Sequence, residues 1–482
     1  MLGAIPISDG FVRFSVWAPQ AGCVGVLGAE LERLDNGIFS GDVPALPGDD
    51  YRYSVDGREL PDPCSRWQPA GVDGPSRVLD TSSFSIRPGP RLDHLVVYEL
   101  HVGTFSPDGT FDGARRGLDQ LAAAGVTAIE VMPVATFPGD RGWGYDGLCT
   151  FAPHHAYGGP QGLARLVDAA HEAGLGVILD VVYNHIGPGS ETLTAFGPYL
   201  TDTDTPWGRV VDYRPRGVRE WAIQNAELWV RDYRIDGLRL DAVHAIVDES
   251  PDHICAELKR RVGGAFVISE TEIGDRRPID EWGHDAQWDD SLHHALHALL
   301  TGERDGYYAG LGSVDDVVRA LRAGTPQLVA CAQNHDQVGN RAAGDRLSPD
   351  RDRVALATVL FARSLPLVFM GEEYGETHPF QFFTDHTDPR IAEATREGRR
   401  REFAAFEEFG DRLPDPQSPE TFARSKLDRK PPSDWFRRAT ELRRSLPDSL
   451  EVDVVSDTVL RLRRGRHTLT VDFGALTLDY GS

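Results

Sequence analysis

The first ninety or so residues alternate apolar and polar side chains with a period of two. In the stretches 12–16 and 51–56, every second residue is apolar. Such alternation, interrupted by turns rich in Gly, Pro and Asp, predicts short antiparallel strands that bury one face. We therefore expect a small β-sandwich, similar to a carbohydrate-binding module, over residues 1–88.

From about residue 95 the pattern changes to short, continuous apolar runs separated by helical segments. Continuous runs are typical of parallel strands buried on both faces. A strand–helix rhythm of this length predicts either a (β/α)₈ TIM barrel with inserted loops or a long doubly wound sheet. No Gly-rich phosphate-binding turn follows the first run, which favours the barrel, and we assign it to residues 89–447. The runs lie at 96–100, 126–131, 176–181, 237–241, 265–270, 327–331 and 366–369.

The last part of the chain returns to β character. The segment 435–445 predicts a helix that closes the barrel domain, and a few strand-like runs follow it around Gly465. We therefore expect a short C-terminal β region over residues 448–482.

Composition and charge restrict the class of protein. No stretch reaches the roughly 18 consecutive apolar residues of a membrane span, and no basic segment precedes an apolar run at the N-terminus. The five cysteines are scattered and odd in number, which fits free thiols in a reducing compartment, so we expect a cytoplasmic protein. The formal net charge of −24 argues against a nucleic-acid partner.

Four of the apolar runs end in side chains that can do chemistry. One run ends in Asn184 and His185, and the other three end in Asp241, Glu270 and Asp336. A single carboxylate at the end of a strand is most often a cap or turn residue. Four such ends in the strand–helix rhythm instead indicate an active site, because barrel enzymes carry their chemistry at the C-terminal ends of the strands.

The spacing within 237–241 has a chemical consequence. Residues two apart on a strand face the same way, so Arg239 and Asp241 share one face. A fixed guanidinium favours an ionised carboxylate, as a nucleophile requires, although the pair could also be a buried structural ion pair. Glu270 has no basic partner nearby in the sequence, so burial should keep it protonated, as a general acid requires. Carboxyl groups with opposed roles fit glycoside cleavage; in retaining enzymes they stand about 5–5.5 Å apart.

These segments resemble the four ordered motifs of the α-amylase family of glycoside hydrolases. The matching residues are Asp180–His185 (DVVYNH), 237–241 (GLRLD), 268–270 (ISE) and 334–336 (NHD). The resemblance implies that Asp241 is the nucleophile, Glu270 the general acid/base and Asp336 a carboxylate that grips the sugar hydroxyls. It also implies a substrate-binding role for further residues: Arg239, His185, His335, Tyr145 as a stacking platform, His244, Gln337, Asn340 and Asp290.

Finer features resemble the trehalose-releasing branch of that family, the maltooligosyltrehalose trehalohydrolases. These features are the segments 285–288 (DAQW), 301–308 with its two tyrosines and 334–341 (NHDQVGNR). The resemblance implies hydrolysis of the α-1,4 bond next to the terminal trehalose of a malto-oligosaccharide. Two features depart from the pattern of that family: the short C-terminal region, and the segment Thr271–Gly274 on the leaving-group side.

Other interpretations remain open at this stage. A branching or debranching enzyme would share the scaffold and the first half of the reaction. A catalytically inactive glucan-binding protein would keep the sandwich but does not need three carboxylates. Trp143, Trp207 and Trp288 could stack on sugars or belong to the core. No dense Asp/Asn loop accompanies Asn184, so we predict neither a metal ion nor any other cofactor.

Overall fold

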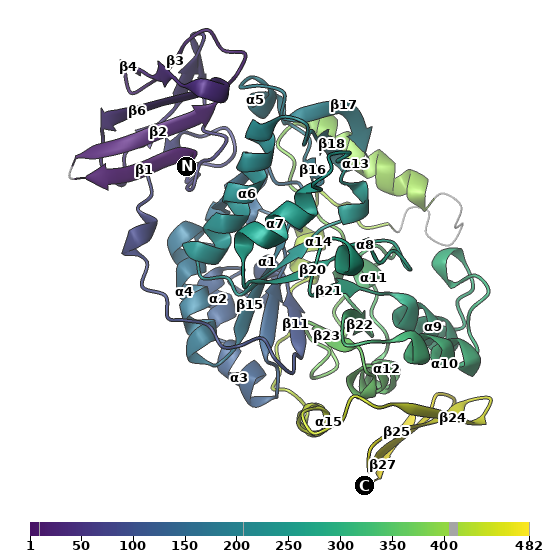
Figure 1. The fold of residues 1–482 in the computed structure, drawn as a ribbon. Coiled ribbons are helices and arrows are strands. Elements are labelled where there is room, and N and C mark those ends of the chain that lie inside the picture. The colour runs from purple at the N-terminus through teal and green to yellow at the C-terminus, as the bar shows by residue number, and fades with distance from the viewer. Residues whose placement is uncertain (9, 206, 404–412, 482) are drawn as a thin grey trace.

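The computed structural model describes residues 1–8, 10–205, 207–403 and 413–481, and within these ranges the chain forms a closed barrel between two smaller β units (Figure 1). The N-terminal unit lies beside one end of helix α6, and the C-terminal sheet lies at the opposite corner of the molecule. None of the described helices combines the length and apolar character that a membrane crossing requires.

The N-terminal unit has two four-stranded antiparallel sheets, in agreement with the alternating pattern of its sequence. Phe14 and Tyr53 stand on different sheets, and their rings meet edge to face at 6.5 Å, so the sheets pack on one another. One sheet has the order β1-β2-β6-β5 (Gly3–Ser8, Phe11–Trp17, Ile38–Pro44, Glu32–Arg33), and the other β4-β3-β8-β9 (Ala29–Glu30, Val24–Val26, Tyr53–Val55, Arg58–Leu60).

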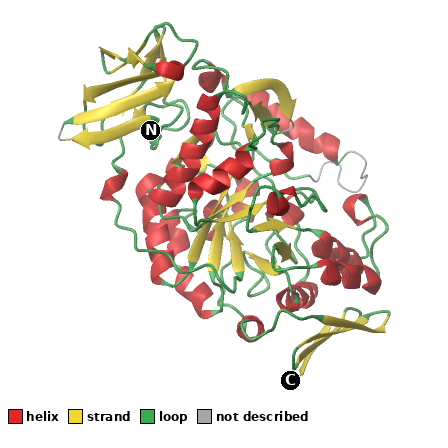
Figure 2. Ribbon diagram, in the orientation of Figure 1, coloured by secondary structure: helices red, strands yellow, loops and turns green. Residues whose placement is uncertain are grey.

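Eight parallel strands close into the barrel, which confirms the fold expected from the sequence. Figure 2 shows these strands at the centre with helices around them. Seven of the eight correspond to the apolar runs of the sequence, and the sixth, β21, was missed because it has only three residues and one is Gln287. The strands are β11 (Val97–Leu100), β12 (Ala128–Val131), β15 (Gly176–Val181), β19 (Gly237–Leu240), β20 (Phe266–Ser269), β21 (Ala286–Trp288), β22 (Leu328–Cys331) and β23 (Leu365–Phe369).

Helices surround the barrel, and loops with short strands lie over the C-terminal ends of its strands. The final helix, α15 (Asp434–Arg443), occupies the segment predicted at 435–445, and the C-terminal sheet follows it as β24 to β27 (Glu451–Ser456, Val459–Arg464, His467–Asp472, Thr477–Gly481). The longer helices of the domain are α4 (Gly159–Glu172), α6 (Arg216–Arg231), α7 (Ile254–Val262), α9 (Ser291–Thr301), α10 (Val314–Ala323), α12 (Pro349–Phe361) and α13 (Pro389–Glu402).

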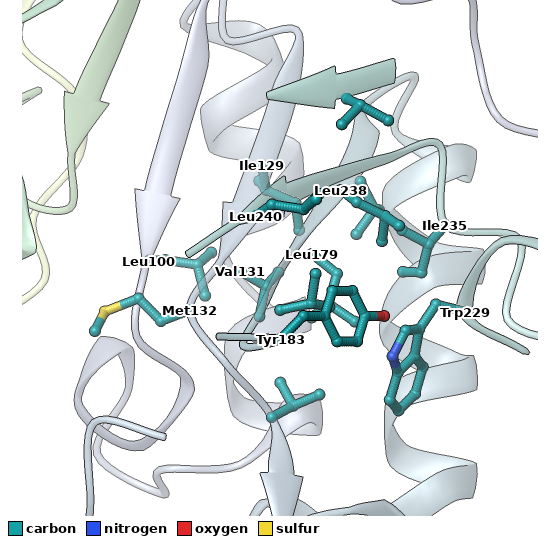
Figure 3. Packing of buried hydrophobic residues seen from close by; sticks show 14 of the residues in the cluster. Leu100, Ile129, Val131, Met132, Leu179, Tyr183, Trp229, Ile235, Leu238 and Leu240 are labelled. Carbon is teal, nitrogen blue, oxygen red and sulfur yellow. The ribbon is translucent and has the colours of Figure 1, made fainter. Parts of the chain in front are cut away.

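The alternation of side chains along the strands separates two apolar clusters. Leu179, Leu238 and Leu240 face outward toward Trp229 of α6 and toward Ile235 (Figure 3). The interior cluster comes from the opposite faces of the strands, and β19 supplies only Gly237 to it. A Cβ at Gly237 would stand 2.7 Å from the carbonyl oxygen of Phe266, so no larger side chain fits there. The interior cluster comprises Leu95, Val97, Ala128, Ile178, Ile268, Ala286, Trp288, Val329, Cys331, Leu365 and Leu367.

On each of four neighbouring strands, the last residue that faces the barrel interior is charged. Glu99, Glu130, Asp180 and Arg239 follow two positions after Val97, Ala128, Ile178 and Gly237, respectively, and none is more than 2% exposed. We call these four residues the charged layer. It lies directly beneath the functional groups at the C-terminal ends of the strands.

The apolar interior layer should carry much of the stability of the barrel. Ile178 is fully buried in it, so Ile178→Ala should lower the free energy of unfolding by about 2–5 kcal/mol through lost burial and a residual cavity. The measurement is the urea midpoint followed by tryptophan fluorescence. Ile273→Ala is the control, because Ile273 is 55% exposed and its loss should cost less than about 0.5 kcal/mol. Equal midpoints for the two variants would contradict this account of the core.

Candidate active site

One guanidinium organises the C-terminal end of the barrel. Nη1 of Arg239 donates to both carboxylate oxygens of Asp180, at 3.0 and 2.9 Å, and to Oδ1 of Asp241 at 3.0 Å. Nη2 lies 2.8 Å from Oε2 of Glu270. The arginine side chain is fully buried, and its cationic carbon lies 4.2 Å from the ring centre of Trp288. A buried cation therefore holds three carboxyl groups around it.

Asp241 directly follows strand β19, and both of its carboxylate oxygens accept hydrogen bonds. Oδ1 receives Nη1 of Arg239, and Oδ2 receives Nδ2 of Asn184 at 2.6 Å. The same amide also donates to the backbone oxygen of Asp241 at 2.9 Å, which fixes the strand end in place. An acceptor-only carboxylate held from two sides is the arrangement that an oxygen nucleophile needs.

Glu270 directly follows strand β20 and stands beside the same guanidinium. Burial raises the pKa of Glu270 to about 8; Arg239 opposes this rise, whereas Asp241 and Asp336 add to it. No basic residue lies near Glu270 in the sequence, but Arg239 reaches it from the neighbouring strand. Desolvation nevertheless outweighs the ion pair, so Glu270 is protonated at neutral pH.

The residue between these two carboxyl groups has an unusual backbone. Ala242 adopts φ 38° and ψ 54°, in the left-handed region that alanine rarely enters. Its N–H donates to Oε2 of Glu270 at 2.9 Å. The left-handed turn therefore orients the backbone of the residue after Asp241 toward the acid of the next strand.

Asp336 lies at the start of the short helix α11 (His335–Gly339). Nε2 of His335 lies 3.3 Å from Oδ1 of Asp336, and Nδ2 of Asn340 donates to the same oxygen at 3.2 Å. Burial acts to raise the pKa of Asp336, but the charge and hydrogen bond of His335 prevail and lower it to about 2. Asp336 is therefore ionised while Glu270 is neutral.

Tyr145 connects this side of the site to the charged layer. Its ring stacks on the ring of His335, with centroids 5.2 Å apart and an interplanar angle of 21°. Its hydroxyl donates to Oδ2 of Asp180 at 2.6 Å and lies 2.8 Å from Nε2 of His335. The tyrosine expected to form a sugar platform is thus held rigidly from two sides.

The other residues predicted from the sequence lie around this centre at different depths. His185 is buried, with Nε2 3.1 Å from the backbone oxygen of Tyr145. Burial raises the pKa of Asp290 to about 7, a shift to which Asp336 adds and which Gln337 opposes. His244 is exposed on the turn after Asp241, and no hydrogen bond joins it to the three carboxyl groups among the described residues.

The three candidate tryptophans separate into two groups. Trp143 is buried and stacks on Phe380 at 5.1 Å, and Trp288 is buried against Arg239, so both belong to the core of the site. Trp207 is 49% exposed, and its ring centre lies 6.2 Å from that of His185, so it alone of the three presents a large free surface for stacking.

Sequence reasoning placed Asp180 and Asn184 in a motif of the site but gave no role to them or to Glu99, although all three contact its members. The available signal was a charged residue inside an otherwise apolar run, which applies to both Asp180 and Glu99. Asn184 is fully engaged by Asp241 and His185. The described residues contain no group of three His, Cys, Asp or Glu side chains arranged to hold a metal ion.

Known proteins match both this sequence and this architecture. The model of the alpha amylase catalytic domain matches residues 75–206. Malto-oligosyltrehalose trehalohydrolase of Saccharolobus solfataricus is 39% identical over 95% of this chain and 89% of its own length. The same enzyme from Rhizobium sp. is 42% identical, with 91% and 86% covered.

Solved structures agree with these sequence matches. A candidate alpha amylase from Salmonella typhimurium superposes with a TM-score of 0.89 at 37% identity, covering 98% of this chain and 93% of its own. A pullulanase of Paenibacillus barengoltzii, at 19% identity and a TM-score of 0.71, covers 98% of this chain and 87% of its own and shares the fold. On the strength of the full-length identities, the chain belongs to the malto-oligosyltrehalose trehalohydrolases of the α-amylase family.

Proposed function

We propose that this protein hydrolyses the α-1,4 bond next to the terminal trehalose of a malto-oligosaccharide, releasing free trehalose. The observation that carries the chemistry is the arrangement of Asp241 and Glu270 around the single guanidinium of Arg239. The observation that carries the substrate is the near full-length identity to trehalohydrolases. The five unpaired thiols support action in the cytoplasm.

The reaction follows from the protonation states of the three carboxyl groups. Glu270, which is neutral at pH 7, donates its proton to the glycosidic oxygen while Asp241 attacks the anomeric carbon. Trehalose leaves, and a covalent glycosyl–enzyme remains on Asp241. Glu270, now ionised, takes a proton from water as that water attacks the anomeric carbon and frees Asp241. The anomeric configuration is retained, because each of the two displacements inverts it.

The remaining groups favour the transition state over the bound substrate. As the sugar ring flattens, positive charge develops on it, and the carboxyl groups of Asp241 and Asp336 stabilise that charge. Asp336 accepts hydrogen bonds from sugar hydroxyls, and one face of the sugar stacks on the ring of Tyr145. Trp207 provides a further exposed aromatic surface at the edge of the site.

Product analysis tests the substrate assignment. Incubation with maltotriosyltrehalose should yield free trehalose and maltotriose, whereas a plain maltodextrin of similar length should be cleaved far more slowly. Chromatography of the products with time measures both. Equal cleavage of the two substrates, or new α-1,6 branch points in the second, would instead indicate an amylase or a branching enzyme.

Substitution of the two reacting carboxyl groups tests their roles. Asp241→Asn should lower kcat by about 10⁴-fold or more, because the amide cannot form the glycosyl intermediate. Glu270→Gln should lower it by about 10²–10⁴-fold, the usual contribution of a general acid. Steady-state trehalose release measures both, with circular dichroism to check folding. Glu281→Gln, at an exposed position, is the control and should retain the full rate; a near wild-type rate in Asp241→Asn would remove its assignment.

The pKa of Glu270 predicts the alkaline limit of activity. Because its raised pKa of about 8 keeps the acid protonated below that value, kcat/KM should fall as pH rises through about 8. A pH–rate profile measures this limb. Asp290 also has a raised pKa, of about 7, so Asp290→Asn identifies the responsible group. The limb should stay near pH 8 in that variant whatever its absolute rate; its disappearance would assign the limb to Asp290.

A further inference from the structure

Glu99 is a buried carboxylate of strand β11 that the reaction described above does not use. It is 1% exposed, and both of its oxygens accept hydrogen bonds from one residue, His335. Oε2 receives the backbone N–H of His335 at 2.8 Å, and Oε1 receives Nδ1 of its ring at 2.5 Å. These bonds cross from β11 to the loop that carries Asp336, so Glu99 fixes both the position and the ring orientation of His335.

The hydrogen bonds on the other side of the ring determine how many protons it carries. The hydroxyl of Tyr145 has a single proton, and it points to Oδ2 of Asp180 at 2.6 Å. The tyrosine oxygen must therefore accept from Nε2 of His335, 2.8 Å away. Nδ1 faces a carboxylate oxygen and must also donate. Both ring nitrogens thus carry protons, and His335 is an imidazolium ion.

We propose that Glu99 is a positioning residue that keeps His335 doubly protonated, so that the site retains a second fixed cation beside Asp336. This inference rests on the proposed hydrolysis only in its functional consequence; the protonation state rests on the hydrogen-bond geometry, with Asp180 and Glu99 as the accepting carboxylates. The groups facing His335 come from several elements: Glu99 (β11), Glu130 (β12), Tyr145 (loop after β13), Asp180 (β15), His101 (after β11) and Asp336 (α11).

Removing the charge of Glu99 should therefore convert His335 into a titrating group. Burial acts to lower the pKa of His335, whereas Asp336 and Glu99 raise it well above its usual value. With Gln at position 99, one of the two opposing carboxylates is gone, so the ring loses its proton at a lower pH. As it does, Asp336 loses its nearest cationic donor, and Tyr145 loses the hydrogen bond to its oxygen.

The neighbouring carboxyl group provides a matched control. Glu130 pairs in register with Glu99 on the next strand and belongs to the same charged layer, yet neither of its oxygens has a hydrogen-bond partner among the described residues. Burial raises the pKa of Glu130 well above its usual value, with Glu99 adding to the rise. Glu130→Gln therefore makes the same Glu-to-Gln change in the same layer without removing a hydrogen bond to His335.

The experiment compares Glu99→Gln with Glu130→Gln in pH–rate profiles of trehalose release. Glu99→Gln should lower kcat/KM at pH 7 by about 10- to 100-fold, a cost typical of carboxylates that orient functional histidines. Its alkaline limb should move at least about one pH unit lower, with the rate partly recovering near pH 5, because the needed form is the protonated one. Glu130→Gln should keep the wild-type limb. An unshifted limb in Glu99→Gln, or the same shift in both variants, would overturn the proposal.

A second measurement depends neither on the folding of Glu99→Gln nor on the assigned substrate. In protein labelled with ¹³C at histidine Cε1, the His335 signal, identified by its loss in His335→Gln, should keep the shift of the imidazolium ion up to at least pH 8. Titration of that signal near pH 6.5 in the wild-type protein would overturn the proposal. If the protein fails to release trehalose yet this signal stays protonated, the proposed substrate is wrong and the doubly protonated state of His335 stands; the same titration in Glu99→Gln then tests the role of Glu99.

Discussion

The site depends on the buried guanidinium of Arg239, which lies within ion-pair distance of Asp180, Asp241 and Glu270 in the barrel interior. Three carboxyl groups without it would repel one another and lose their hydration with no compensation. With it, their separation becomes fixed by the short spacing of the guanidinium nitrogens. Burial, together with repulsion from Asp241 and Asp336, then leaves the proton on Glu270.

The barrel tolerates these buried charges because it keeps them apart from the apolar surfaces that stabilise the fold. The outer faces of the strands pack against the helices through an extended apolar cluster, and the lower interior is apolar as well. Only the upper interior layer is charged, on four adjacent strands. The apolar lower interior and the outer faces of the strands therefore supply most of the stability, and the upper layer can carry the catalytic groups.

Much of the fold and site could be predicted from the sequence, because buried parallel strands leave apolar runs and the reacting groups come directly after them. Asp241, Glu270 and Asp336 each end such a run and meet in space. What could not be predicted depends on contacts between strands: the ion pair of Arg239 with Glu270, and the bonds of Glu99 to His335. Strand β21 was missed since three residues with a central glutamine carry no periodic signal. The exposure of His244, too, depends on a turn geometry that the sequence pattern does not encode.

The left-handed backbone of Ala242 links catalysis to heat resistance. A residue with a Cβ in that conformation costs roughly 1–2 kcal/mol compared with an ordinary helix or strand position. The chain tolerates this cost next to its nucleophile because the resulting turn supplies the N–H that meets Glu270. Evolution toward hotter environments therefore has little freedom here: a glycine would relieve the strain but loosen the turn, and a branched residue would increase the strain. Adaptation to temperature must come from other parts of the molecule, such as its helical shell and its two flanking β units.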